Sequence, residues 1–240
     1  MKGKEFEKLL KNVSRFLNEG KYAEALEASE KAIEWNPEDV GTWVKKGIVL
    51  RRLGRYQEAV DAYDKAIALN PKYADAWYNR GVAYRFLAWT NKDPRGHQEA
   101  MKSYSQAVEL NPQHINALLN LGNVLFLLKR FQEAKDTYNK AVKIDPKDAE
   151  AWFNYSLAVS RLGEYQDALE ASERTLNLNP EMAFAWCIKS ISLRLMGKET
   201  AAHQAYNQAI NLDSELRKSS QFENLENSLA PFRRDETINE

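Results

Sequence analysis

Four asparagines at corresponding places in the sequence could hold a polypeptide. Asn79, Asn120 and Asn154 follow one another at intervals of 41 and 34 residues, and Asn123 lies three residues after Asn120. An asparagine side chain both donates and accepts hydrogen bonds, as a peptide backbone does. A row of such side chains could therefore bind an extended peptide with little regard to the peptide's own side chains.

Aromatic and basic residues accompany the asparagines. An aromatic ring that faces a groove would suit an anchor for a bound segment, and packing between neighbouring helices is the alternative for each ring. The basic residues favour an acidic residue in the bound peptide, although Glu7, Asp75 and Glu150 partly offset their charge. The candidate aromatic residues are Tyr78, Phe86, Phe126 and Phe153, and the candidate arginines are Arg51, Arg85 and Arg194.

These residues belong to a 34-residue pattern that predicts a pair of helices. In residues 40–73, apolar and small side chains recur at helical spacing in two successive segments. Gly54 is expected to end the first helix, because glycine accepts the left-handed conformation there, and Pro71 cannot continue the second. Gly47 and Ala59 are small, so the two helices can approach closely. Numbered from 1 at the start of the repeat, the pattern has Trp43, Gly47 and Leu50 at 4, 8 and 11, and Tyr56, Ala59, Tyr63 and Ala66 at 17, 20, 24 and 27.

The pattern occurs six times, with alanine at position 20 each time. A fixed period of this length indicates a helical solenoid, in which each hairpin buries its apolar face on its neighbours. The pattern resembles that of the tetratricopeptide repeat family, which has Trp, Leu-Gly, Tyr, Ala, Phe, Ala and Pro at fixed offsets. The resemblance implies an all-α, right-handed superhelical solenoid that binds a protein segment in a concave groove lined by the first helix of each hairpin. The expected repeats are 6–39, 40–73, 74–114, 115–148, 149–182 and 183–216, within a single solenoid domain of residues 1–230.

The third repeat is seven residues longer than its neighbours, and the additional residues lie between its two helices. Seven residues are about two helical turns. We therefore expect the first helix to run to about Asn91 and the second to start at Pro94, with Asp93 as its N-cap. Trp89 would lie near the tip of a projecting hairpin and form an accessory surface, covered by packing, by a partner or by a second copy of the chain.

Other expectations concern the fourth repeat and the C-terminal segment. Lys129 stands where glycine usually ends the first helix, and the cost of left-handed geometry predicts a shifted turn. Gly122, at position 8, is expected to lie against Ala134 and to tolerate no large side chain. The residues after Leu216 predict a capping helix at about 220–230 and a flexible tail at 231–240.

The overall charge argues against some classes of partner. The chain has 34 Lys and Arg and 34 Asp and Glu, so its net charge is close to zero. This balance disfavours a general nucleic-acid or membrane-surface binder. The single cysteine, Cys187, fits a reducing compartment, and the N-terminal residues lack the apolar core of a signal peptide. We therefore expect a cytoplasmic protein.

No pattern of residues predicts catalysis. The three histidines, His97, His114 and His203, have no spacing that joins them to one another or to Cys187 as metal ligands. The glycines are explained by the repeat and form no phosphate-binding loop. We expect no cofactor and no enzymatic activity. The sequence favours a scaffold or adaptor that binds a peptide segment, with self-association left open; the alternative is an RNA-binding helical-repeat protein, which a gel shift with random RNA at low salt would reveal.

Overall fold

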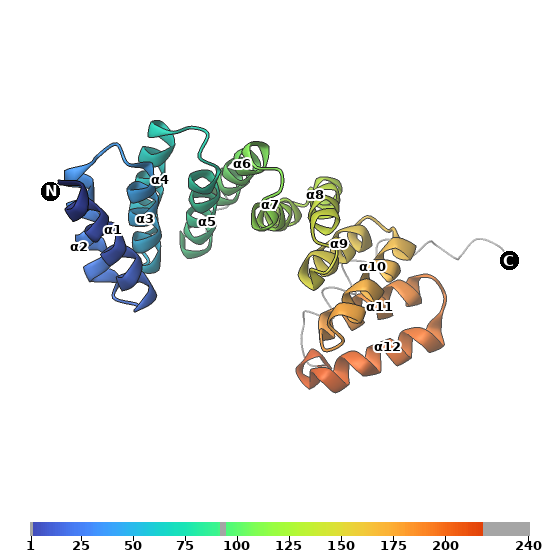
Figure 1. Ribbon diagram of the computed structural model, residues 1–240. Coiled ribbons are helices and arrows are strands. Elements are labelled where there is room, and N and C mark those ends of the chain that lie inside the picture. The colour runs from blue at the N-terminus through green and yellow to red at the C-terminus, as the bar shows by residue number, and fades with distance from the viewer. Residues whose placement is uncertain (1, 92–94, 218–240) are drawn as a thin grey trace. The chain divides into compact units, whose positions relative to one another are not determined.

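The computed structural model describes residues 2–91 and 95–217, and this part of the chain is all-α (Figure 1). Consecutive helices form antiparallel hairpins, as the repeat predicts. The six hairpins are α1 (Lys2–Asn18) with α2 (Tyr22–Trp35), α3 (Val40–Arg52) with α4 (Tyr56–Leu69), α5 (Ala74–Asn91) with α6 (Arg95–Leu110), α7 (Ile115–Leu127) with α8 (Phe131–Ile144), α9 (Ala149–Arg161) with α10 (Tyr165–Leu178), and α11 (Ala183–Leu195) with α12 (Glu199–Leu212).

The chain divides into two compact units, Met1–Val124 and Leu125–Glu240, which we call the N-terminal and C-terminal units. In the N-terminal unit, α3 contacts its own partner α4 and also α1 and α5, which are the first helices of the neighbouring hairpins. In the C-terminal unit, α9 and α11 are in contact in the same way. The first helices of successive hairpins therefore lie side by side within each unit.

The alanine at position 20 packs in the interior of every hairpin. Each of the six is completely buried, which confirms the register that the sequence predicts. A methyl group at this position lets the second helix lie close to its neighbours. These residues are Ala25, Ala59, Ala100, Ala134, Ala168 and Ala202.

The tryptophan at position 4 ties the start of a hairpin to the turn before it. In each case the indole Nε1 donates a hydrogen bond to the carbonyl oxygen of the proline six residues earlier. The bond satisfies the polar edge of a ring whose remainder packs on apolar side chains. The pairs are Trp43 with Pro37 at 2.8 Å, and Trp77 with Pro71, Trp152 with Pro146 and Trp186 with Pro180 at 2.9 Å.

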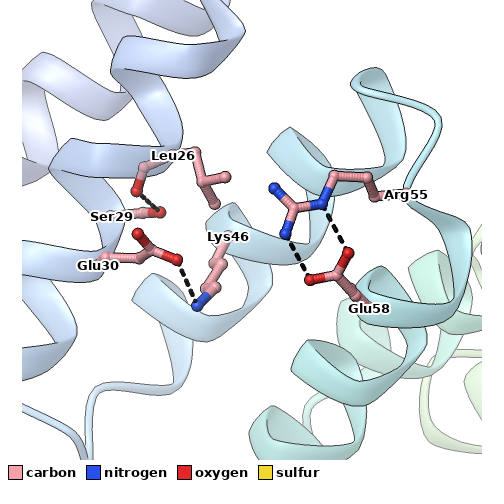
Figure 2. Close-up of polar contacts among 6 residues, drawn as sticks. All are labelled: Leu26, Ser29, Glu30, Lys46, Arg55 and Glu58. Atoms are coloured by element: carbon pink, nitrogen blue, oxygen red, sulfur yellow. Dashed lines mark hydrogen bonds and ion pairs between the residues drawn. The ribbon is translucent and has the colours of Figure 1, made fainter.

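Ion pairs add a second connection between neighbouring hairpins. Figure 2 shows Lys46 of α3 beside Glu30 of α2, with 3.0 Å between Nζ and Oε1. The same two repeat positions, 7 and 25 of the preceding hairpin, pair Arg80 with Asp64 at 2.6 Å and Lys189 with Glu173 at 2.8 Å. Partly exposed ion pairs contribute little to the free energy of unfolding. We therefore interpret these pairs as contacts that help to align neighbouring hairpins.

The turn at Lys129 differs from its prediction. Lys129 has a φ of 60°, so it adopts the left-handed conformation that Gly54 adopts at a φ of 76°, and the turn is not shifted. The backbone N–H of Arg130 donates to Leu125 at 2.9 Å, as that of Arg55 does to Leu50. The hydrogen bonds that end the helix outweigh the steric cost of a side chain at this φ.

The long third hairpin agrees with its prediction as far as the structure describes it. Helix α5 runs to Asn91 and has 18 residues against 13 in α3, about one turn more, while Asp93 and Pro94 lie outside the described residues. The extension is packed, because a Cβ atom on Gly96 of α6 would lie 2.8 Å from the Cβ of Ala88 in α5.

The described part of the chain ends in a short 3-10 helix, Ser214–Arg217. Its Leu216 is buried and joins a cluster with Cys187, Ile191 and Ile210. The predicted capping helix and tail lie outside the described residues.

Candidate functional site

The rings of two buried tyrosines pack directly against glycines at position 8. A Cβ atom on Gly47 of α3 would lie 2.4 Å from Cε1 of Tyr63 in α4, and one on Gly81 of α5 would lie 2.7 Å from the ring of Tyr104 in α6. Real Cβ atoms do not approach a ring so closely, so only glycine leaves room for these rings. The sequence predicts a close approach of the two helices from the small residues Gly47 and Ala59, but not the contact between Gly47 and the tyrosine.

An arginine follows each of these glycines by four residues, on the same face of its helix. Burial raises the pKa of the Tyr63 phenol to about 12, and the adjacent charge of Arg51 partly opposes this rise. Burial raises the pKa of the Tyr104 phenol well above its usual range, and the charges of Arg85 and Arg51 both oppose that rise, whereas Tyr78 adds to it. Both arginines therefore lie within electrostatic reach of the Tyr104 hydroxyl.

The asparagines at position 6 are held by their own helices. Nδ2 of Asn79 donates to the carbonyl oxygen of Asp75, and Nδ2 of Asn120 donates to that of Asn116, each at 2.8 Å. Nη1 of Arg85 donates to Oδ1 of Asn120 at 3.0 Å, which links α5 to α7. These bonds fix the orientation of both amides before any ligand arrives and leave each of them one further N–H to donate.

We call this surface of the N-terminal unit the A-helix wall. Its members are half-buried, and neither of its arginines takes part in an ion pair with a described residue. The wall consists of Arg51 of α3, Asn79 and Arg85 of α5, and Asn120 and Asn123 of α7.

The candidate aromatic residues at position 5, Tyr78 and Phe153, are half-buried and contact neighbouring side chains. Tyr78 contacts the ring of His114 at a centroid distance of 4.7 Å and that of Tyr104 at 5.9 Å. Phe153 packs on a buried cluster that includes Val159 and Ile188. Position 5 also carries buried residues elsewhere, namely Val44, Leu119 and Cys187. These contacts favour the packing alternative at position 5, and the role of Tyr78 and Phe153 as peptide anchors stays a prediction.

The other two candidate rings also rest on neighbouring aromatic residues. Phe86 is stacked on Tyr56, with centroids 5.0 Å apart and an angle of 5° between the planes. Phe126 meets Phe131 edge to face at 5.0 Å, and the guanidinium of Arg161 lies 5.6 Å above its ring. These contacts favour the packing alternative for both rings.

The remaining candidates, Asn154 and Arg194, belong to the C-terminal unit. Nδ2 of Asn154 is buried and has no hydrogen-bond partner among the described residues, so Asn154 lacks the bond to its own helix that Asn79 and Asn120 make. Arg194 is half-buried near the end of α11. We treat these two residues separately from the A-helix wall.

The sequence analysis did not predict that Tyr63 and Tyr104 belong to this site, although the sequence contains a signal for them. Hairpins two and three alone among the six combine glycine at position 8, arginine at position 12 and tyrosine at position 24. This combination occurs in consecutive hairpins, and the charges of both arginines act on the Tyr104 hydroxyl.

Family models match most of the repeat region. A TPR repeat model matches residues 47–85, and tetratricopeptide repeat models match residues 97–158, 28–61 and 16–39. The chain is a tetratricopeptide repeat protein. No curated protein matches the sequence significantly.

Solved tetratricopeptide repeat structures have a similar fold. YrrB, a TPR protein with an unusual peptide-binding site, is 24% identical, with 80% of this chain and 95% of YrrB covered and a TM-score of 0.71. MamA is 21% identical, with coverage of 75% and 94% and a TM-score of 0.66. PilF of Pseudomonas aeruginosa is 17% identical, with coverage of 92% and 98% and a TM-score of 0.72. At these identities the likeness shows the fold alone.

This tetratricopeptide repeat protein has a further surface at its long third hairpin. Trp89 is 83% exposed near the end of α5. A pocket of about 450 Å³ lies between the same end of α5, at Leu87, Thr90 and Asn91, and the start of α4, and Trp89 does not line it. Arg55 and Glu58 line the pocket and bind each other through two hydrogen bonds, of 2.6 and 2.5 Å (Figure 2). The extension therefore builds a surface that the other hairpins lack the length to form.

Within residues 2–91 and 95–217, we find no group of three or more His, Cys, Asp or Glu that could hold a metal ion. No helix in the same ranges has the length and apolar character needed to span a membrane.

Proposed function

We propose that this protein is a non-enzymatic scaffold and that its A-helix wall binds an extended peptide segment of a partner protein. The observation that carries this proposal is the pair of matching amides, Asn79 and Asn120, each fixed by a bond to its own helix. Because they occupy the same position in consecutive hairpins, they offer a bound strand two similar points of attachment. The likeness to YrrB, a TPR protein with a peptide-binding site, supports the proposal.

The amides can serve a peptide backbone in both directions. After its bond to Asp75, Asn79 keeps one N–H and its carbonyl oxygen for a ligand. Asn120 keeps one N–H and a second lone pair on the oxygen that accepts from Arg85. Recognition through backbone groups would tolerate many peptide sequences.

We expect modest affinity, roughly micromolar, because ordering a flexible peptide offsets much of the contact energy. Preorganised amides reduce the cost on the side of the protein. The peptide would carry the larger entropic loss.

A selection from a random dodecapeptide library displayed on phage tests the proposal. The immobilised full chain should enrich a set of peptides, and fluorescence anisotropy with a labelled enriched peptide should give a dissociation constant. The double variant Asn79→Ala with Asn120→Ala should weaken binding at least tenfold while circular dichroism shows an unchanged fold. Asn207→Ala is the control, because Asn207 is an exposed asparagine on α12, a helix that carries no member of the A-helix wall.

Two outcomes would refute the proposal. One is a selection that enriches no peptide above a blank surface. The other is an enriched peptide whose binding survives the double asparagine substitution but is lost in Trp89→Ala, which would place the site on the third hairpin.

A further inference from the structure

We propose that Arg51 and Arg85 form an anion-binding site that receives the carboxylate of an aspartate or glutamate side chain in the bound peptide. The inference rests on the proposed function, because it names a feature of the peptide that the A-helix wall would select.

The first argument is that these two cations are not neutralised within the fold. The half-buried cations at position 7 of the same two hairpins, Lys46 and Arg80, each lie within 3.0 Å of a carboxylate. Arg51 and Arg85 are also half-buried, yet neither has an acidic partner among the described residues. A partly desolvated charge without a partner is costly, and a ligand carboxylate would remove that cost.

The second argument is an unsatisfied hydroxyl at the same place. The side chain of Tyr104 is completely buried, and its hydroxyl has no hydrogen-bond partner in the described part of the chain. The hydroxyl is within electrostatic reach of both Arg51 and Arg85. Buried polar groups are nearly always paired, so a hydroxyl without a partner within electrostatic reach of two cations that lack an acidic partner indicates a missing acceptor. An oxyanion would supply an acceptor for the two guanidinium groups and a negative charge close to the hydroxyl.

The third argument is the preorganisation of Arg85. One nitrogen, Nη1, donates to Asn120, which restrains the guanidinium. The other N–H groups of the fork stay available, and a guanidinium fork matches a carboxylate in shape. Asn120 therefore acts as a positioning residue for the anion site as well as a contact for the peptide backbone.

Adjacent first helices set the size of the site. Arg51 and Arg85 occupy position 12 of consecutive hairpins, on helices α3 and α5 that contact each other. Packed helices have axes about 8–10 Å apart, a distance that two arginine side chains can close around one carboxylate. A peptide that continues past α3 and α5 presents side chains, not its C-terminus, to the two arginines. We therefore expect the bound carboxylate to be that of an Asp or Glu side chain, not the C-terminal carboxylate.

The test uses the same displayed dodecapeptide library. Selection on the wild-type chain should enrich Asp or Glu at one peptide position, and selection on Arg51→Gln with Arg85→Gln should lose that enrichment. Arg52→Gln is the matched control, because Arg52 is the next residue on α3, carries the same charge and is exposed. It should leave the enrichment unchanged.

An affinity measurement on the best enriched peptide then isolates the carboxylate without altering the protein. Replacing the enriched Asp by Asn, or Glu by Gln, should weaken binding to the wild-type chain about tenfold. The same replacement should have little effect on the double arginine variant, as a coupled pair requires. The variant Arg51→Lys with Arg85→Lys keeps both charges but loses the planar guanidinium groups. In this variant the acid-to-amide replacement should weaken binding less than in the wild type and more than in the double Gln variant.

Distinct outcomes overturn the inference and the proposed function. If the acid-to-amide change in the peptide is neutral while the double asparagine variant loses binding, the anion site is wrong and the peptide site stands. A peptide that binds only with its free C-terminal carboxylate, or that binds more tightly with phosphoserine at the acidic position, would assign the arginines to a different anion. Enrichment of no peptide at all would refute the proposed function itself.

Discussion

The ring of Tyr63 occupies the space where any other residue in place of Gly47 would put its Cβ atom. The ring is completely buried and so has little room to move. Its hydroxyl lies near Arg51, one helical turn further along α3. One absent side chain thus allows both the close packing of the hairpin and the approach of the phenol to the wall.

Replacing Gly47 should destabilise the protein even with alanine. A Cβ atom at 2.4 Å from Cε1 of Tyr63 forces the ring or the helix to move, at a cost on the order of 1–3 kcal/mol. Gly41→Ala is the control on the same helix, since its Cβ would make only an ordinary contact of 3.4 Å with Asp39. That change should stabilise α3 by about 0.5–1 kcal/mol. Thermal midpoints that move in the same direction for the two variants would contradict this account.

Gly122 occupies the same position 8 in the fourth hairpin, and its intolerance of a large side chain stays a prediction. Gly122→Leu should lower the thermal midpoint, with a loss on the order of 1–3 kcal/mol from overpacking. An unchanged midpoint would show that the repeat register is incorrectly assigned there.

The hairpins could be predicted from the sequence because their signals are local. Position 20 falls on the buried face of its helix, and a glycine or proline marks most helix ends, as Gly54 and Pro71 do. Residue spacing also gives the end of α5 at Asn91.

Features that depend on a neighbouring hairpin were harder to predict. Val44 packs in a cluster with Ala76 and Ala83 of the next hairpin, a contact that the spacing within one repeat does not contain. The backbone preference of lysine disfavours the left-handed conformation at Lys129. The backbone hydrogen bond from Arg130 to Leu125 stabilises the turn enough to outweigh this preference. The link from Arg85 to Asn120 spans 35 residues, and no local rule contains it.

Lys129→Gly should stabilise the protein. A lysine in the left-handed region costs about 1–2 kcal/mol, and the greater unfolded-state entropy of glycine offsets part of the gain, which leaves roughly 0.5–1 kcal/mol. Urea unfolding followed by circular dichroism should show a higher midpoint for this variant than for the wild type.

Lys140→Gly is the control for this prediction, because Lys140 is an exposed lysine in the interior of α8 and has no positive φ. Glycine inside a helix is less favourable than an ordinary residue by up to about 1 kcal/mol, so the urea midpoint of this variant should fall. Equal shifts for the two variants would argue that Lys129 is not held in the left-handed conformation in solution.

Alkaline pH should destabilise the fold through its buried phenols. The pKa of Tyr63 is raised to about 12 in the folded state, whereas an unfolded tyrosine loses its proton near the ordinary value of 10.0. The protonated phenol of Tyr63 therefore makes its full contribution to the free energy of unfolding below pH 10. This contribution is lost as the pH rises from about 10 to 12, because the unfolded state binds fewer protons there than the folded state.

The variant Tyr63→Phe isolates this effect. It keeps the ring against Gly47 but cannot ionise, so its thermal midpoint should fall less steeply than that of the wild type between pH 10 and 11. Tyr22→Phe serves as the control, because Tyr22 is only half-buried at the start of α2. Parallel curves for wild type and Tyr63→Phe would show that this phenol ionises as easily in the folded state as in the unfolded state.

The two aromatic residues at the extended end of α5 should differ in their effects on stability. Phe86 is stacked on Tyr56 of the preceding hairpin, whereas Trp89 is 83% exposed. Phe86→Ala should cost about 2 kcal/mol, because it removes a half-buried ring and its stacking contact. Trp89→Ala should stay within about 0.5 kcal/mol of the wild type, as expected for an exposed side chain.

Thermal midpoints and amide exchange together check this last prediction. Amides in residues 86–91 of the wild type should exchange more slowly than in an unstructured peptide, and Phe86→Ala should accelerate them. A large loss of stability in Trp89→Ala would mean that the indole is covered in solution. If sedimentation then showed a dimer in the wild type and a monomer in Trp89→Ala, the cover would be a second copy of the chain.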